Sequence, residues 1–272
     1  MTPMSILLWT AGTALGLFIL FRAAYWFNEG RKLQVSGYMT PPSTKLARWT
    51  FKLIANVGTR LLVGPVQVFG KENARFQGRA LVLPNHMITW DFGVVGKAIP
   101  FSYRQLSKAA EIKNPFVATV AAWIGTVGVQ VEGGKSQDGG GQAVVDTGAK
   151  ILTYSKGSRM LLFPQGMLIY SGDIGPKTFR TGATRMLQQA AAQIGDEPLY
   201  ALPVAIRYKT HRQEATWFQR LTYALGMKLI RTFRYSEKAL GEDGQPIMKD
   251  GKPVYVKKSM VLYGATVAIG KP

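Results

Sequence analysis

The sequence predicts an α/β fold with a mixed, largely parallel sheet flanked by helices. From residue 65 onward, short apolar runs alternate with longer segments of helical character, and this alternation is typical of parallel or mixed sheets. The chain has 272 residues, 47% of them hydrophobic, which is enough to fill one sizeable core. We expect two parts: a membrane anchor with a basic amphipathic helix (residues 1–64) and an α/β domain (residues 65–272).

The first part opens with a long apolar segment. An uncharged run from Ser5 to Phe21 is followed by Arg22 and then by apolar residues as far as Phe27. A helix from Ile6 to Phe27 is about 33 Å long, against a hydrocarbon core of about 30 Å. A cleaved signal peptide is the alternative, but the first five residues carry no Lys or Arg and no small-residue cleavage pattern follows. We expect a retained anchor that spans the membrane or dips into one leaflet.

Basic residues gather on the C-terminal side of this segment, namely Arg22, Arg31, Lys32, Lys45 and Arg48. Such residues are retained on the cytoplasmic side of membranes. We therefore expect a membrane protein whose α/β domain lies on the cytoplasmic face.

Residues 45–64, KLARWTFKLIANVGTRLLVG, predict a basic amphipathic helix that Ser43 or Thr44 can cap. At 100° per residue, its basic and apolar side chains fall on different sides. The basic side holds Lys45, Arg48, Lys52 and Arg60, and the apolar side holds Leu46, Leu53, Ile54, Val57 and Leu61. The helix can lie on anionic headgroups or pack on a soluble core, and its place after the apolar segment favours the membrane interface.

Six runs in the second part predict strands and two segments predict helices. The strands are VQVF, ALVLP, VGVQV, MLLFP, LYALPVAIRY and MVLYGATVAIG, and the helices are GQAVVDTGAKILTYSK and TGATRMLQQAAAQIG. The glycine-rich segment Gly133–Gly141 lacks the spacing of phosphate-binding loops, so we interpret it as a flexible connector.

The net charge indicates anionic partners. The chain carries 34 Lys and Arg against 15 Asp and Glu, a net charge of +19, which suits nucleic acid, anionic membranes and phosphorylated or acidic substrates. The apolar segment, and the lack of a basic motif interleaved with aromatic residues, favour anionic membrane lipids, and nucleic acid is not expected as a partner. The chain has no cysteine, which excludes disulfides, thiolate metal sites and a cysteine nucleophile.

The stretch LPNHMITWDF holds one of the two histidines. His86 follows a strand that Pro84 ends, and Asp91 comes five residues later; α/β folds place their active sites at such strand ends. A spacing of five brings the two side chains together on neither a helix nor a strand, so they meet only if a turn intervenes. Asp91 then fixes the imidazole tautomer, and the other nitrogen can take a proton near neutral pH. The spacing by itself favours a structural role.

Two more loops beside predicted strands and helices hold candidate site residues. MLLFPQGMLIY holds Phe163, Pro164, Gln165 and Gly166, and KTFRTGATRM holds Arg180 and Gly182. Gly166 allows close approach of the backbone to a ligand, and Gln165 offers a neutral donor and acceptor. Arg180 and Gly182 precede a helix whose N-terminus can hold an anion. His211, in the basic segment YKTHRQE, is expected to be a solvated surface residue.

Taken together and in this order, LPNHMITWD, LLFPQGM, FRTGA and ALPVAIRY resemble the glycerolipid acyltransferase family that includes 1-acylglycerol-3-phosphate (lysophosphatidic acid) acyltransferases. The resemblance runs from Val66 to Tyr208, with a fainter match at VAIGKP. It implies a glycerol-phosphate-acyltransferase-like α/β fold with N-terminal membrane helices. It also implies an enzyme that moves an acyl group from an acyl thioester to a glycerolipid hydroxyl.

The resemblance assigns roles to single residues. His86 is the general base on the acceptor hydroxyl, and Asp91 orients it. The substrate-binding residues are Asn85, Lys108, Phe163, Pro164, Gln165, Gly166, Arg180 and Gly182. Lys108, in SKAAEIKNPF ahead of Pro115, is expected to help bind phosphate. No metal site and no permanently bound cofactor are expected, because acyl transfer needs a base, an oriented acceptor and a stabilised oxyanion; acyl-CoA or acyl-carrier protein is the donor.

One block departs from the family pattern. Where the family reads F-P-E-G-T-R, this chain reads FPQGML, so Gln165, Met167 and Leu168 replace a glutamate, a threonine and a phosphate-binding arginine. We expect a membrane-associated O-acyltransferase that acts on a lysophospholipid, with 1-acylglycerol-3-phosphate as acceptor and phosphatidic acid as product. The alternatives are another lysolipid, a non-phosphate hydroxyl acceptor, or a non-catalytic basic membrane-surface protein.

Overall fold

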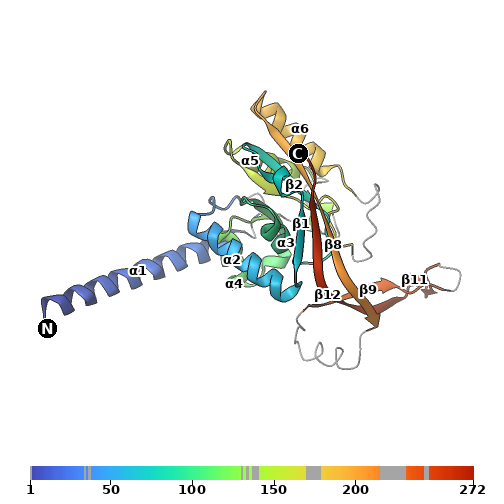
Figure 1. Cartoon of the computed structure of the whole chain (residues 1–272), viewed down its shortest axis with the longest axis horizontal. Coiled ribbons are helices and arrows are strands. Elements are labelled where there is room, and N and C mark those ends of the chain that lie inside the picture. Colours follow the sequence, from blue (N-terminus) through green and yellow to red (C-terminus); the bar gives the residue numbers. More distant parts are fainter. Residues whose placement is uncertain are drawn as a thin grey trace.

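The computed structural model describes residues 2–33, 35, 38–129, 131–132, 135–136, 141–169, 179–214, 231–241 and 245–272. Its centre is a sheet with the strand order β1-β12-β8-β2-β7-β3-β4, and β9 pairs with β12 at one end (Figure 1). The strands are β1 (Val66–Phe69), β2 (Arg79–Pro84), β3 (Arg104–Lys108), β4 (Val127–Val129), β7 (Arg159–Leu161), β8 (Leu199–Glu214), β9 (Thr232–Lys238) and β12 (Tyr255–Ile269).

The sheet is mixed and largely parallel, as predicted. Strands β8, β2, β7, β3 and β4 pair in parallel, β12 runs antiparallel to β8, and β1 runs parallel to β12. Carboxyl ends of parallel strands meet at one edge of a sheet. The segments that follow β2 and β7 therefore lie beside each other and beside β8.

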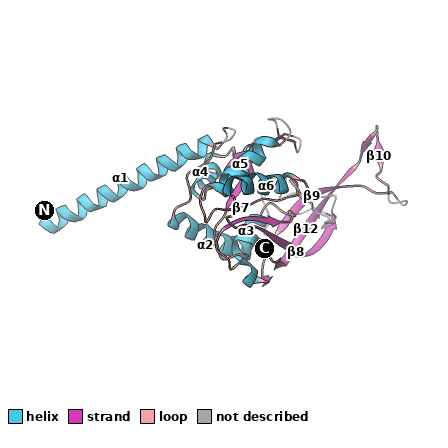
Figure 2. Cartoon of the chain, turned by 90° about the horizontal axis from the view of Figure 1, so that it is seen from above, coloured by secondary structure: helices cyan, strands magenta, loops and turns pink. Residues whose placement is uncertain are grey.

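Helices cover both faces of the sheet, and neighbouring residues of β2 face different layers. Leu81 packs with α5 (Gln142–Thr153) and α6 (Gly182–Ile194), whereas Val82 packs with side chains of α2 (Lys45–Leu62) and α3 (Asp91–Ala98). Successive strand side chains point to opposite faces, so each apolar strand serves two cores. Figure 2 shows α5 and α6 on one side of the strands and α2 and α3 on the other.

The apolar N-terminal segment forms one continuous helix, α1 (Pro3–Lys32), which extends away from the rest of the chain (Figure 1). Trp9–Lys32 is long and apolar enough to cross a membrane, and only 6% of its apolar window is buried. Its exposed large side chains include Trp9, Leu15, Leu17, Phe18, Ile19, Leu20 and Phe21. The helix therefore has the bare apolar surface of a membrane-anchor candidate.

The end of α1 packs on α4 (Pro115–Trp123). Trp26 and Leu33 share a small core with Ala118 and Ala122. A Cβ atom on Gly30 would lie 2.7 Å from the backbone of Ala118, so the close approach of the two helices at this point requires glycine. This contact fixes the direction in which α1 leaves the α/β domain.

Thr44, one of the two predicted caps, begins α2 by accepting a hydrogen bond from the Ala47 amide at 3.1 Å. The buried face of the helix consists of Ala47, Phe51, Ala55 and Thr59. The predicted apolar side is instead exposed: Leu46, Leu53, Ile54, Val57 and Leu61 lie there, joined by Trp49. The helix thus packs on the α/β core and also keeps a bare apolar face. The domain division after residue 64 stays a prediction.

Each of the six runs that predict a strand contains one in the structure, although most of the observed strands differ in length from the runs. β4 covers the first part of VGVQV, β7 ends before Phe163, and β8 and β12 are longer than predicted. β3 was not predicted because its residues, RQLSK, are mostly polar. The glycine-rich segment holds the short strand β6 (Lys135–Ser136), which pairs with β5 (Val131–Glu132), and its other residues up to Gly140 lie outside the described part of the chain.

Strands β8, β12 and β9 continue as an antiparallel ribbon beyond the sheet, with the hairpin β10 (Met248–Lys249) and β11 (Lys252–Pro253) farther along (Figure 1). Sequence patterns missed β9 because Phe233 and Tyr235, which pack on the core, alternate with polar residues in TFRYSEK, and they missed the hairpin because strands of two residues are too short to show a period. His211 lies on this ribbon and is exposed, as predicted. Two short 3-10 helices, η1 (Lys71–Ala74) and η2 (Ala109–Ile112), connect the remaining elements.

Candidate active site

His86 and Asp91 meet through a turn. His86 lies two residues after the end of β2, and Asp91 is the first residue of α3. The imidazole Nδ1 lies 2.8 Å from Asp91 Oδ2. Because a carboxylate oxygen only accepts, Nδ1 carries the proton and Nε2 is left as the basic nitrogen. The imidazole side chain keeps 21% of its surface exposed, whereas the carboxylate is fully buried.

The Asp91 carboxylate accepts hydrogen bonds on both oxygens. Oδ2 also receives the backbone amides of Met87 (2.5 Å) and Ile88 (2.9 Å), which close the turn between His86 and α3. Oδ1 receives the hydroxyl of Tyr208 from β8. The carboxylate therefore cannot rotate away from the imidazole without breaking several hydrogen bonds.

Sequence patterns did not single out Tyr208, although it belongs to the run ALPVAIRY. In β8 the buried side chains alternate through Leu202, Val204, Ile206 and Tyr208, and a buried tyrosine hydroxyl needs a partner. That alternation was the available signal. Burial, followed by the charge and hydrogen bond of Asp91, raises the pKa of Tyr208 well above its usual value of 10, so the hydroxyl stays protonated and remains a donor.

The loop after β7 holds both the ring and the backbone of His86. The Phe163 ring stacks on the imidazole, with centroids 3.8 Å apart and an angle of 13° between the planes. Gln165 Oε1 accepts a hydrogen bond from the His86 amide at 2.5 Å, and the His86 carbonyl accepts one from the Ile169 amide at 2.8 Å. The imidazole is thus fixed from one side by Asp91 and from the other by this loop.

Gln165 has one unused donor. The side chain is 1% exposed, and its Nε2 atom is buried without a hydrogen-bond partner among the described residues. A buried amide without a partner is costly. An oxygen atom of a ligand near His86 would satisfy it.

The Arg180 side chain packs against the backbone of Gly166. Gly166 has φ of +66°, which favours glycine, and a Cβ atom there would lie 3.2 Å from Arg180 Nε. The Arg180 amide donates to the Pro164 carbonyl at 2.9 Å. The basic side chain predicted to bind phosphate is therefore docked on the loop that holds His86.

Asn85 is turned toward the sheet. Its Nδ2 atom donates to the Ile206 carbonyl at 3.0 Å, and its Oδ1 atom accepts from the Ile206 amide at 2.6 Å. These bonds tie the end of β2 to β8 and so position His86. They are the contacts of a positioning residue, and the predicted contact of Asn85 with substrate stays a prediction.

Neither Lys108 nor Gly182 contacts His86 among the described interactions. Lys108 ends β3, which is two strands from β2, a separation of about 10 Å. Gly182 is the first residue of α6, and Thr181 makes no side-chain cap there; uncapped amides at a helix N-terminus are suited to an anion. In the described ranges, no group of three or more His, Cys, Asp or Glu side chains comes together in the manner of a metal site.

Comparison with known proteins places the chain in a family. The Acyltransferase family model matches residues 65–207. A comparison with curated protein sequences gives no match. Among solved structures, the chain is similar to the crystal structure of the 1-acyl-sn-glycerophosphate (LPA) acyltransferase PlsC from Thermotoga maritima, with 15% identity, 97% of this chain and 86% of that chain covered, and a TM-score of 0.48.

The family match covers more than half of the chain, and it includes the sequence-predicted site residues from Asn85 to Gly182. It also bears out the resemblance drawn from the four sequence blocks. The chain belongs to the Acyltransferase family and is an acyltransferase.

Proposed function

We propose that this acyltransferase moves a fatty acyl group from an acyl thioester to the free hydroxyl of a lysophospholipid, with 1-acylglycerol-3-phosphate as acceptor and phosphatidic acid as product. The observation that carries the proposal is the 2.8 Å contact between His86 Nδ1 and Asp91 Oδ2, which leaves Nε2 as a base on the exposed side of the imidazole. Family membership also removes the reason to keep the alternative of a non-catalytic membrane-surface protein.

In the proposed reaction, His86 Nε2 takes the proton of the acceptor hydroxyl as its oxygen attacks the thioester carbonyl. The tetrahedral intermediate then collapses, the carbon–sulfur bond breaks, and the thiolate takes the proton back from the imidazolium. Asp91 stabilises the imidazolium while it exists. The product is an ester and the free thiol of coenzyme A or acyl-carrier protein.

The acceptor would lie between His86 and the start of α6. Arg180, together with the open amides at Gly182, offers positive charge for a phosphate, and Gln165 Nε2 offers a hydrogen bond to an acceptor oxygen. In this proposal, these groups hold the acceptor within reach of His86 Nε2. Lys108 is a further phosphate ligand in this proposal.

A second acceptor class is favoured by the block FPQGML. Gln165 carries no charge, and Met167 and Leu168 supply no cation where the related family block carries an arginine; Met167 is 55% exposed. An acceptor without a phosphomonoester, such as another lysolipid or another hydroxyl compound, forgoes no contact with this block, whereas in a site with the family block it would forgo the contact with the arginine.

We further propose that the enzyme works on a membrane surface, with its catalytic domain on the cytoplasmic face. The support is the bare apolar surface of α1 and the exposed apolar side chains of α2, which lie next to basic residues. Acyl-CoA and acyl-carrier protein are both anionic donors, and a net charge of +19 attracts either one.

The test is a panel of acceptors assayed with a labelled acyl thioester in membranes containing the full chain. We expect the highest kcat/KM with 1-acylglycerol-3-phosphate and a lower value with monoacylglycerol. Arg180→Gln should reduce transfer to the phosphate acceptor alone, and Arg207→Gln, an exposed site on β8, is the matched control. Equal rates with both acceptors would favour the second class, and transfer to no lysolipid would refute the proposal.

A further inference from the structure

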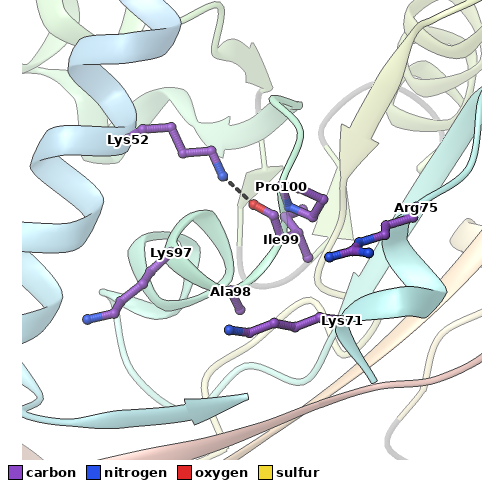
Figure 3. A pocket seen from close by; sticks show the side chains of 7 residues that line it. All are labelled: Lys52, Lys71, Arg75, Lys97, Ala98, Ile99 and Pro100. Carbon is purple, nitrogen blue, oxygen red and sulfur yellow. Dashed lines mark hydrogen bonds between the residues drawn. The ribbon is translucent and has the colours of Figure 1, made fainter. Parts of the chain in front are cut away.

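A cavity of about 240 Å³ lies at the end of α3 that is farther from Asp91 (Figure 3). Its lining consists of Lys52, Lys71, Arg75, Lys97, Ala98, Ile99 and Pro100. Asp91 begins α3 and Ala98 ends it, seven residues later in the helix, which corresponds to about 10 Å. The cavity is therefore a place distinct from the proposed base, and none of its lining residues contacts His86 among the described interactions.

The charged lining residues are four cations from three elements. Lys52 comes from α2, Lys97 from α3, and Lys71 and Arg75 from η1 and the residue after it. Within the described ranges, none of the four forms an ion pair with an acidic side chain. Glu72 belongs to the same turn as Lys71, but it does not line the cavity. The positive charge therefore has no compensating carboxylate in the cavity wall.

Lys52 also contacts the C-terminal end of α3. Its Nζ atom donates to the Gly96 carbonyl at 2.6 Å and to the Ile99 carbonyl. Figure 3 draws the hydrogen bond to Ile99. These carbonyls belong to the C-terminal end of α3, where a helix carries partial negative charge. The ammonium group of Lys52 therefore offsets part of this negative charge next to the cavity. Burial lowers the pKa of Lys52 to about 8, and a bound anion would favour its charged form.

The turn that carries Lys71 and Arg75 is fixed to the sheet. Gly70 has φ of +69°, and a Cβ atom there would lie 2.2 Å from the Ile269 carbonyl oxygen. The same carbonyl accepts a hydrogen bond from Asn73 Nδ2 at 2.8 Å. In Figure 3, Lys71 and Arg75 extend from this turn toward Ala98 and Ile99, Lys52 reaches in from α2, and Lys97 points outward. Three of the cations thus converge from rigid supports.

We propose that this cavity binds a phosphate group, carried by a phospholipid headgroup or by a soluble phosphate compound. The guanidinium of Arg75 can hold two phosphate oxygens, and the lysines add point charges. At about 30 Å³ for each water molecule, the cavity has room for a phosphate and several waters. The headgroup source is favoured by α2, which supplies Lys52 and also carries the exposed apolar side chains Leu53 and Val57. The site does not depend on the acyl acceptor.

The test measures the reactivity of single lysines in the full chain. An amine-reactive ester is applied at low dose, and mass spectrometry gives the modification rate of each lysine. The first arm uses protein in neutral detergent with inorganic phosphate. The second uses phosphatidylcholine vesicles that contain phosphatidic acid, or phosphatidylglycerol at the same surface charge. We expect phosphate to slow modification of Lys71 by at least about threefold, because charge-assisted hydrogen bonds withdraw the amine from reaction.

Lys45 and Lys249 are the internal controls, because both are exposed and neither lines the cavity. Arg75→Gln should remove the protection of Lys71, and Arg207→Gln should leave it intact. Protection in both arms supports the phosphate site with either source, protection only with phosphatidic acid supports a headgroup site, and protection only with inorganic phosphate supports a soluble ligand. Protection in neither arm, equal protection of Lys45, or protection that survives Arg75→Gln overturns the proposal. Activity is not the readout, so failure here leaves the proposed reaction untouched.

Discussion

Asp91 accepts hydrogen bonds from three separate parts of the fold. The amides of Met87 and Ile88 come from the turn, the imidazole of His86 comes from the end of β2, and the hydroxyl of Tyr208 comes from β8. A carboxylate held in this way orients the imidazole and keeps its tautomer fixed. Changes to these donors should therefore alter the rate of the chemical step more than the binding of substrate.

Tyr208→Phe tests this positioning of Asp91 by removing a single hydroxyl group. The substitution leaves Asp91 Oδ1 without its donor inside the core, and hydrogen bonds to charged groups contribute about 1.5–3 kcal/mol. We expect kcat to fall about three- to tenfold while KM changes by less than about twofold, since Tyr208 acts through Asp91. The steady-state rates of Tyr263→Phe, whose side chain is 57% exposed, provide the control. A change in KM alone would contradict the positioning role.

Gln165 tests the other support of His86. Gln165→Ala removes the acceptor of the His86 amide, so we expect kcat to fall by about tenfold or more, the usual scale for a lost buried hydrogen bond. Gln165→Glu keeps an acceptor oxygen in the same place and should recover part of the lost rate. Equal rates for the two variants, measured with the preferred acceptor, would show that this hydrogen bond does not position His86.

Lys52 gives the protein a dependence of stability on pH. Burial lowers its pKa in the folded chain from 10.5 to about 8, so between these values the unfolded chain holds the proton and the folded chain has released it. Stability from this residue therefore rises with pH across that window, and the cost of burying the charge is fully present below pH 8. Lys52→Met should abolish this rise in thermal unfolding temperature, measured in neutral detergent from pH 7.5 to 10.5. An unchanged profile would contradict the assignment.

Helices α2 and α3 meet through glycines and one tryptophan. Cβ atoms on Gly58 of α2 and Gly93 of α3 would lie 2.4 Å and 2.5 Å from the Trp90 ring. The Trp90 indole donates to Thr59 Oγ1 at 3.0 Å. The indole thus occupies the space between the two helices, and α3 carries the Asp91 that orients the imidazole.

Gly58→Ala should therefore loosen this helix pair. The added methyl group forces Trp90 to move, and overpacking of this kind costs about 1–3 kcal/mol. We expect a lower unfolding temperature and a lower kcat. Gly157→Ala is the matched control, because a Cβ atom there meets nothing within 4 Å. If both variants unfold at the same temperature, the tryptophan contact does not hold the helices together.

Helix α2 also shows which element-level features sequence patterns can predict. The apolar side chains were predicted to share one side because a 100° period belongs to the helix itself. Which side meets the core depends on partners that are distant in sequence. Phe51 and Ala55 are buried in one core with residues of α3, and the side that holds Leu53 and Val57 remains exposed. The Tyr208 contact was missed for the same reason, since 117 residues separate Tyr208 from Asp91.

At the scale of the whole molecule, the parallel strands explain why the predicted loops converge. The α/β class followed from the alternation of apolar runs and helical segments, and the sheet order brings the ends of β2 and β7 to one edge beside β8. Spacing alone could not bring His86 and Asp91 together, because the turn between them is closed by the Asp91 side chain itself. Strands β9 and β12 and the end of β8 lie beyond the family match; β8 and β12 were predicted from their apolar runs, whereas the mostly polar strand β9 was not.

The proposed reaction requires His86 as the general base of acyl transfer. Its most direct test compares His86→Ala with His211→Ala, the other histidine of the chain, which is exposed on β8. Turnover of a labelled acyl thioester with a lysolipid acceptor is measured in membranes at equal protein levels. We predict that His86→Ala loses at least about 100-fold in kcat, the usual contribution of a positioned base, and that His211→Ala keeps normal turnover. Unchanged turnover in His86→Ala would show that His86 is not the base.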